Sequence, residues 1–198
     1  METATKMALD TLINSSAVIP GINLNRPLPP ALQGLTDIGS ATRYEDEIFG
    51  IIDHIQLFED LGRAEVSQLC RKMECFSARR GDVIVQEDDD GDFLGIILTG
   101  EVDVVKRGAN GEAKQLAVIG PGASVGEMSL INGRPRFATC IAREPTDIAV
   151  LTRDAIYDIL VLQPSLGNKV LLILLQIASQ RLRETSSRLL PFIGSATN

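Results

Sequence analysis

The stretch GEMSLINGRPRFAT at residues 126–139 places one acid and two arginines among residues that favour turns. Residues 127–131 predict about one turn of helix, because Asn132-Gly133 ends any helical pattern there. The start of a helix presents unpaired N–H groups and a partial positive charge, which together favour an anion. Glu127 at that start is either a helix-capping acid or an acceptor for the hydroxyl groups of a ligand.

Glycines before Glu127 and a proline before Arg136 indicate how these two side chains are held. Three glycines leave the approach to the acid free of side chains: Gly120, Gly122 and Gly126. Pro135 fixes the chain just before Arg136, whose planar guanidinium suits a phosphate better than lysine does. The pattern predicts an anion-binding site beside a site that binds hydroxyl groups, as a sugar phosphate requires. A purely structural Glu–Arg pair is the alternative.

The sequence lacks the patterns of an enzyme or a metal site. His54 is the only histidine, and its expected place is the polar face of an amphipathic segment, so His-containing triads and His-rich metal sites are excluded. The run GPGASVG at residues 120–126 has its third glycine one residue late for a dinucleotide-binding loop. The run DDDGD at residues 88–92 lacks the ligands that a calcium loop needs before and after it. We expect no catalytic residue, no metal ligand and no enzymatic activity.

The composition of the whole chain predicts a soluble, cytoplasmic protein. The 198 residues carry a net charge of −7, which argues against a nucleic-acid partner because binding to phosphate backbones needs a clustered positive surface. The longest apolar run, at residues 170–178, is far shorter than the roughly 20 residues of a membrane span. The N-terminus also lacks the apolar core of a signal peptide. Three cysteines without C-x-x-C spacing indicate reduced thiols: Cys70, Cys75 and Cys140.

Two parts of the chain differ in pattern. Residues 1–43 hold four of the nine prolines and no sustained period, which predicts an extended N-terminal arm, with a disordered tail as the alternative. From residue 44, apolar residues recur at helical spacing over 48–55 and again over 66–73. Short strand-like runs separated by turns follow: VIVQ, FLGIIL, EVDVVK, QLAVIG, FATCIA and DIAVL. Residues 44–198 therefore predict one α+β domain, mainly β: an antiparallel β jelly-roll barrel flanked by N-terminal helices and a long C-terminal helix.

Two helices are expected after the strands, over about 153–161 and 165–190, with Ser165 capping the second. The second helix carries two apolar stripes. The heptad stripe has the spacing of a coiled coil: Leu171, Leu175, Ala178, Leu182, Thr185 and Leu189. The second stripe lies near the start of the helix: Val170, Ile173, Leu174 and Ile177. One stripe can pack on the domain while the other meets a partner helix in a homodimer through residues 165–190. The alternative is that both stripes lie in the core of one chain.

Residues 126–139 resemble the phosphate-binding cassette of the cyclic nucleotide-binding domain family. The family motif reads roughly G-E, a small or apolar residue, A or S, L, and later P-R-x-A-T. Other segments resemble the family in the same order: LF at 57–58 with Leu61, GDVIVQ, GDFLGIILTGEV and EPTDIAVLTRDAIYDIL. The resemblance covers about residues 50–190, and its types are catabolite activator proteins and protein kinase A regulatory subunits.

The resemblance implies roles for individual residues. Glu127 would accept the ribose 2′-hydroxyl, and Arg136 would pair with the cyclic phosphate. Further residues would line the same pocket: Gly126, Met128, Ser129, Phe137, Ala138 and Thr139. Arg134 falls outside the motif and is expected to be a solvated loop residue. The run RLRETSSRL resembles bacterial catabolite activator proteins, where a Thr-Ser pair on the dimer helix meets the adenine amine, which implies that role for Thr185 and Ser186.

Four residues depart from the family pattern. Glu87 stands where a glycine is common, Gly95 stands where an aromatic residue is common, and Val125 replaces a frequent phenylalanine. Phe137 stands where the family has a small residue, or a threonine that favours cyclic GMP by meeting the guanine amine. Phe137 has no hydroxyl to offer, so the resemblance favours adenine. Its bulk would narrow the pocket.

The sequence thus predicts a stand-alone sensor of cyclic AMP that signals through a dimer, the N-terminal arm or an unidentified effector protein. Because few residues follow the predicted dimer helix, no helix-turn-helix domain is expected. The alternatives are a cyclic GMP-binding sensor and a dimeric interaction module with a vestigial pocket.

Overall fold

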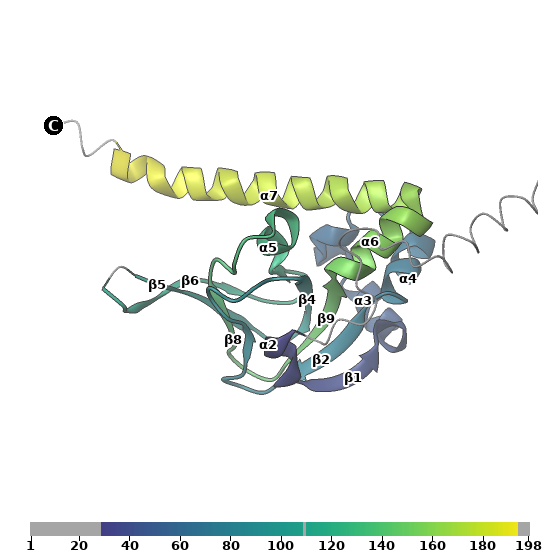
Figure 1. Cartoon of the computed structure of the whole chain (residues 1–198), viewed down its shortest axis with the longest axis horizontal. Coiled ribbons are helices and arrows are strands. Elements are labelled where there is room, and N and C mark those ends of the chain that lie inside the picture. The colour runs from purple at the N-terminus through teal and green to yellow at the C-terminus, as the bar shows by residue number, and fades with distance from the viewer. Residues whose placement is uncertain (1–28, 109, 194–198) are drawn as a thin grey trace, which may run out of the picture.

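The computed structural model describes residues 29–108 and 110–193, with side chains described as far as residue 187. Figure 1 shows its sheets lying beneath one long helix. The strands are β1 (Thr36–Ser40), β2 (Glu74–Ala78), β3 (Val83–Val85), β4 (Phe93–Thr99), β5 (Val102–Arg107), β6 (Ala113–Ile119), β7 (Ser124–Val125), β8 (Thr139–Ala142) and β9 (Thr146–Thr152). The α-helices are α2 (Pro30–Gln33), α3 (Glu45–Gly50), α4 (Arg63–Cys70), α5 (Glu127–Asn132), α6 (Arg153–Leu162) and α7 (Pro164–Ile193).

The strands form two antiparallel sheets, with the orders β1-β2-β9-β4-β7 and β3-β8-β5-β6. Side chains alternate between the two faces of a strand, and along the central strands of the first sheet both faces are buried. Phe93 and Ile97 of β4 pack with residues of the second sheet in one apolar cluster, whereas Leu94 and Ile96 pack with the helices in another. The predicted combination of antiparallel strands with flanking helices is confirmed. The hydrogen-bonded strands belong to two separate sheets, and a closed barrel is not seen in the described residues.

The N-terminal helical segment is more broken than its apolar spacing predicts. Instead of one helix over 48–55, the chain forms α3 and two short 3-10 turns, η2 (Ile52–His54) and η3 (Gln56–Phe58). His54 is exposed, as expected. A further 3-10 turn, η1 (Ala41–Tyr44), precedes α3. Within the predicted arm, β1 pairs with β2, so this part of the chain is an edge strand of the first sheet. Residues 1–28 of the predicted arm lie outside the described residues.

The two C-terminal helices lie close to their predicted positions, with one correction. The prediction that Ser165 caps the last helix is wrong, because α7 begins at Pro164 and Ser165 is its second residue. Proline suits the first helical position, where its missing N–H costs no hydrogen bond. The second stripe is buried, as one of the two stripes was expected to be: Val170, Ile173, Leu174 and Ile177.

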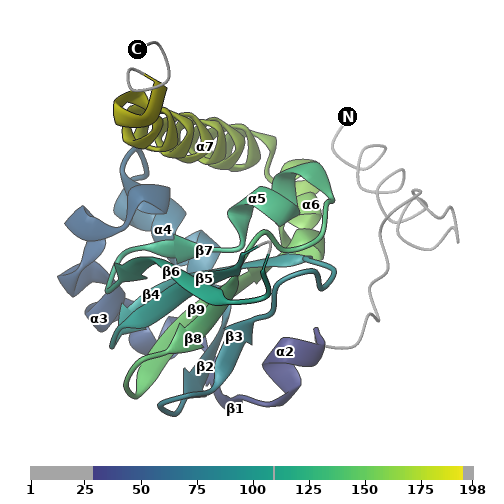
Figure 2. The same ribbon diagram turned by 90° about the vertical axis from the view of Figure 1, so that its left-hand side faces the viewer.

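Helix α7 runs along one side of the molecule over most of its width (Figure 1). Figures 1 and 2 both show α5 and α6 between α7 and the sheets. Its length brings residues far along the chain close to the cassette, residues 126–139. Despite that length, no helix of residues 29–108 and 110–193 is both long and apolar enough to cross a membrane.

Candidate functional site

The site is built at the start of α5, where the chain turns from strand to helix. Gly126 has φ +83° and precedes the first helical residue, Glu127. The helix ends at Asn132, and Gly133 follows with φ +65°. Only glycine adopts such angles without strain. The one-turn helix predicted from the sequence is therefore confirmed, with a glycine at each end.

Glu127 is fully buried, although it is a charged residue. Its carboxylate forms an ion pair with Arg181 of α7, with 2.5 Å between Oε1 and Nη1. Neither oxygen receives a well-directed hydrogen bond from any residue that the structure describes. Burial raises the pKa of the Glu127 carboxyl, while the positive charges of Arg181 and then Arg136 act to lower it. Glu127 thus offers buried acceptor oxygens that a ligand's hydroxyl groups would satisfy.

Arg136 is also buried, with 3% of its surface exposed. Its Nη1 donates to the carbonyls of Phe93 and Gly126 at 2.9 and 2.8 Å. The guanidinium carbon lies 4.3 Å from the centre of the Phe93 ring, a cation–π contact. Burial lowers the pKa of Arg136, and the negative charge of Asp92 opposes that shift. Arginine nevertheless stays charged in proteins.

The main chain of Arg136 is fixed as well. Its N–H donates to the carbonyl of Asp89 at 2.8 Å, and its carbonyl accepts from the N–H of Asp88 at 3.0 Å. The loop between β3 and β4 therefore holds the main chain of Arg136 in place. Its Nη2 is buried and has no hydrogen-bond acceptor among the described residues. A buried cationic donor of this kind fits an anionic ligand oxygen.

Gly126 permits the close approach of Arg136. A Cβ added at Gly126 would collide with Nη1 of Arg136 and lie 2.9 Å from the Phe93 carbonyl. We predict that Gly126→Ala lowers the free energy of unfolding by about 2–5 kcal/mol, from the left-handed backbone and from overpacking. Urea denaturation measures this loss.

Gly81 provides the matched control for that substitution. It has a similar φ of +91°, but nothing lies within 4 Å of an added Cβ. Gly81→Ala is therefore expected to cost only the backbone contribution, about 1–2 kcal/mol. Equal losses in the two variants would contradict the steric argument.

The remaining predicted cassette residues differ in exposure. Ser129 is buried, and its Oγ donates to the Pro135 carbonyl at 3.3 Å. Ala138 and Thr139 are also buried, and Thr139 Oγ1 accepts from the N–H of Glu87 at 3.0 Å. Met128 is exposed. The hydroxyls of Ser129 and Thr139 thus fix the loop, whatever part they take in binding.

Phe137 is not packed into the core, since 53% of its surface is exposed. Nζ of Lys106 lies 4.4 Å from the centre of its ring. Thr185 and Ser186 are exposed on α7, and Thr185 Oγ1 donates to the carbonyl of Arg181 at 2.9 Å. Arg134 is exposed too, in agreement with its expected place in a solvated loop.

Arg181 is the site residue that the sequence reasoning missed. Besides its ion pair with Glu127, its Nη2 donates to the carbonyl of Ser124 at 2.6 Å. It lies four residues before Thr185, and residues at that spacing share one face of a helix. The resemblance that implies a ligand-binding role for Thr185 could therefore have pointed to Arg181.

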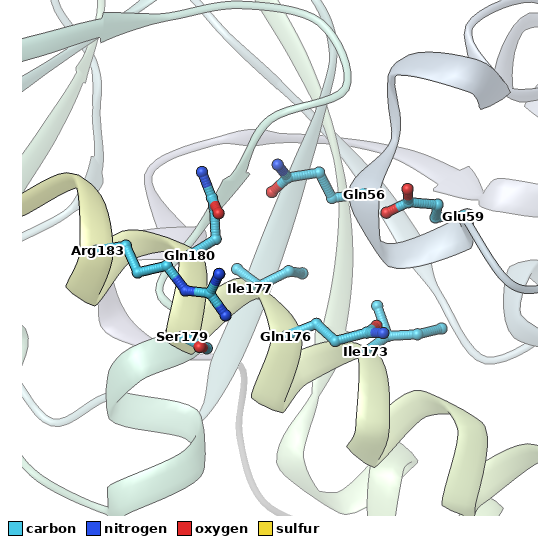
Figure 3. A pocket seen from close by; sticks show the side chains of 8 residues that line it. All are labelled: Gln56, Glu59, Ile173, Gln176, Ile177, Ser179, Gln180 and Arg183. Atoms are coloured by element: carbon cyan, nitrogen blue, oxygen red, sulfur yellow. The ribbon is translucent and has the colours of Figure 1, made fainter.

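A groove with a largely polar lining lies between α7 and η3. Figure 3 shows Gln56 and Glu59 on one side of this groove and α7 on the other. Its α7 side includes Gln176, Ile177, Gln180 and Arg183. None of these residues was predicted to bind ligand.

The two antiparallel sheets place the protein in the jelly-roll class of folds. Its short cassette presents a buried acid and a buried arginine, as a ligand-binding domain of this class would. A family model described as "Cyclic nucleotide-binding domain" matches residues 75–161. A solved cyclic nucleotide-binding domain from Methylobacillus flagellatus is 46% identical, with a TM-score of 0.74, over 83% of this chain and 92% of that one. The chain belongs to the cyclic nucleotide-binding domain family, as its sequence indicated.

Two further relatives are regulatory proteins. The chain is 24% identical to the CRP-like cAMP-activated global transcriptional regulator of Mycobacterium tuberculosis, over 72% of this chain and 62% of that protein. It is 27% identical, with a TM-score of 0.61, to the regulatory subunit of a cAMP-independent protein kinase A from Trypanosoma brucei, over 76% of this chain and 53% of that one. The chain thus spans less than two thirds of either relative.

Proposed function

We propose that this protein is a regulatory sensor that binds cyclic AMP in the cassette and signals through α7. The observation that carries the proposal is the buried pair of Glu127 and Arg136. Both present buried polar atoms without a hydrogen-bond partner among the described residues: the Glu127 carboxylate, whose Oε1 is ion-paired with Arg181, and Nη2 of Arg136. A ribose cyclic phosphate supplies matching groups, a hydroxyl and an anion. In this assignment Glu127 accepts the ribose 2′-hydroxyl and Arg136 binds the phosphate.

The other cassette residues complete the proposed pocket. Gly126 leaves room for the arginine, and the main chain around Met128, Ser129 and Ala138 faces the phosphate. Phe137 and Thr139 border the pocket, while Thr185 and Ser186 on α7 approach the base. The backbone hydrogen bonds of Arg136 to Asp88 and Asp89 support this assignment, because they preorganise the anion site before ligand arrives.

Cyclic AMP is the proposed ligand, with cyclic GMP as the alternative. The Mycobacterium relative is named as cAMP-activated, which supports cyclic AMP. The Trypanosoma relative is named as part of a cAMP-independent kinase, so relatives with this fold differ in their response to cyclic AMP. Phe137 favours adenine because it offers no hydroxyl to a guanine amine.

Arg181 supports a route from the ligand to α7. Its ion pair and its hydrogen bond to Ser124 join the helix to both ends of the turn that carries Glu127. A ligand hydroxyl that bonds to Glu127 changes the electrostatic balance of that ion pair. Binding would then shift the population of α7 positions, because it alters the contact that holds the helix to the cassette.

The exposed face of α7 is the proposed surface through which the protein forms a homodimer and passes on its signal. Three leucines of the heptad stripe are 40–68% exposed: Leu171, Leu175 and Leu182. The side chain of Leu189 lies outside the described residues. Met128 and Ile131 add exposed apolar surface on α5, which contacts α7. An apolar stripe left open beside a buried one fits a partner helix. Beyond the dimer, the effector protein is unidentified.

The protein is proposed to be non-catalytic and cytoplasmic. The two relatives are regulators by name, which supports a regulatory role without chemistry. Cys70, Cys75 and Cys140 are free and buried, as expected for thiols in a reducing compartment. Burial raises the pKa of Cys70 to about 11, so this thiol is unreactive at neutral pH.

Thermal unfolding with cyclic AMP, cyclic GMP and buffer tests the proposal. We expect both nucleotides to raise the melting temperature and cyclic AMP to raise it more. At a ligand concentration one hundred times the dissociation constant, the stabilisation is about 2.7 kcal/mol. Stabilisation by neither nucleotide would sink the sensor function and leave a dimeric interaction module with a vestigial pocket. A larger shift with cyclic GMP would reverse the choice of base.

A further inference from the structure

Lys106 on β5 joins three segments that are far apart in the sequence. Its Nζ forms an ion pair with Oε1 of Glu87 at 2.7 Å. The same Nζ donates to the carbonyl of Phe137 at 2.7 Å and lies 4.4 Å from the centre of the Phe137 ring. An ammonium group has three N–H donors. Lys106 therefore holds both the peptide and the ring of the residue that follows Arg136.

Glu87 fixes Lys106 in turn. Its side chain is only 7% exposed, and its second oxygen accepts from the N–H of Arg107 at 2.9 Å. The hydrogen bond from Lys106, and then that from Arg107, lowers the pKa of the Glu87 carboxyl. Glu87 is therefore ionised at neutral pH. Because the Glu87 carboxylate is buried and also accepts a hydrogen bond from Arg107, it holds the ammonium of Lys106 in one place.

The peptide that Lys106 holds lies inside the cassette. The carbonyl of Phe137 and the N–H of Ala138 belong to one planar peptide group and point in opposite directions. Since the carbonyl is directed to Lys106, the N–H of Ala138 is directed away from it. The main chain of Arg136 is held in turn by hydrogen bonds with Asp88 and Asp89. The segment 136–138 thus has one fixed orientation.

The Phe137 ring lies against the ammonium of Lys106, and more than half of the surface of this residue is exposed. An exposed aromatic ring held still beside an anion site can serve as a stacking surface for a nucleotide base, because every base has a π-face. If the ring were free to rotate, binding of the base would have to order it, and this loss of entropy would offset part of the stacking free energy.

We propose that Lys106, held by Glu87, is a positioning residue that fixes Phe137 as a rigid wall against the base of the bound nucleotide and thereby sets base selectivity. This inference rests on the proposed nucleotide-binding function. It ties together two of the residues that depart from the family pattern, Glu87 and Phe137, through a lysine that the motif did not single out.

Calorimetric titration with cyclic AMP, cyclic GMP and cyclic CMP tests the proposal. Lys106→Met keeps the length of the side chain and removes its charge. We expect it to weaken binding of the preferred nucleotide about three- to ten-fold, as for the loss of one or two hydrogen bonds. Lys106→Met should also lower the ratio of the affinity for purine nucleotides to that for cyclic CMP. Phe137→Leu, which removes the flat ring, should lower this ratio too.

A double-mutant cycle separates positioning from a general loss of structure. If Lys106 acts through Phe137, the variant that carries both substitutions should be no more altered in selectivity than Phe137→Leu alone. Lys106→Arg should restore selectivity, since arginine keeps the charge and the donors. Glu87→Gln, which removes the charge that holds Lys106, provides a second variant should Lys106→Met fold poorly, and it should lower the ratio as well.

Arg143→Met is the control. It removes an exposed ion pair with Glu101, 3.5 Å long, just after a strand that pairs with β5, and it should change neither affinity nor selectivity. An unchanged selectivity ratio in Lys106→Met, or additive effects in the cycle, would overturn the inference alone. A wild-type protein that binds none of the nucleotides would overturn the proposed function and this inference together.

Discussion

Replacing Arg136 by alanine is expected to reduce the affinity for cyclic AMP by about a hundred-fold or more. Charge-assisted hydrogen bonds contribute roughly 1.5–3 kcal/mol each, and a guanidinium facing a phosphate makes two. Nη2 of Arg136 is the buried donor without an acceptor in the described residues, so the phosphate would meet this end of the side chain. Calorimetric titration of the folded variant measures the loss directly.

Two controls make the Arg136 result specific. The carbonyls of Phe93 and Gly126 lose their shared donor in Arg136→Ala, so the variant will also be less stable. Arg136→Lys keeps a positive charge without the planar fork and should bind with intermediate affinity. Arg134→Ala changes an exposed arginine two residues earlier and should bind as the wild type does. Tight binding of cyclic AMP by a folded Arg136→Ala protein would refute the phosphate role.

The local geometry of the site was predictable because local residues determine it. Gly126, Gly133 and Pro135 each restrict or free the main chain at one position, so a short helix followed by a pinned arginine could be expected. Arg181 could not be found in this way. Its contact with Glu127 depends on how a 30-residue helix lies across the domain, and packing over such a sequence distance has no local pattern.

Three strands were missed, β1, β2 and β7, and the same distinction explains two of them, β1 and β7. The predicted runs at β3 to β6, β8 and β9 contain β-branched residues bounded by turns. The sequence of β1, TDIGS, is mostly polar, and the strand forms through its pairing with β2. β7 is only two residues long and pairs with β4. Tertiary context therefore decides these strands, and intrinsic propensity does not.

Two departures from the family pattern become intelligible once the register is known. Gly95 of β4 and Val125 of β7 are paired directly across the sheet. A Cβ at residue 95 would lie 3.2 Å from Cγ2 of Val125, so the pair is already close. Gly95 and Val125 both stand where the family often has larger side chains, and the two reductions occur at one contact. Neither could be interpreted from its own position in the sequence.

The substitution Leu175→Asp is expected to convert the proposed dimer into a monomer. Leu175 lies in the heptad stripe of α7 and is 58% exposed in the single chain, so a partner helix would remove it from water. Burial of a leucine side chain contributes about 1.5–3 kcal/mol, and a two-fold axis repeats the substitution in both subunits. The dimer should weaken by at least a hundred-fold, as sedimentation equilibrium over a range of protein concentrations would show.

Leu172→Asp is the matched control, because it makes the same chemical change on the same helix outside both stripes. Leu172 is 61% exposed and lies about a quarter turn from the heptad stripe at 100° per residue. In a helix pair that meets along the heptad stripe, Leu172 flanks the contact and stays partly in water, so this variant should weaken the dimer much less than Leu175→Asp does. Equal weakening by the two substitutions would place the interface on another face of α7. A wild-type protein that is monomeric at every concentration, with and without cyclic AMP, would remove the dimer from the proposed mechanism and leave the ligand site unaffected.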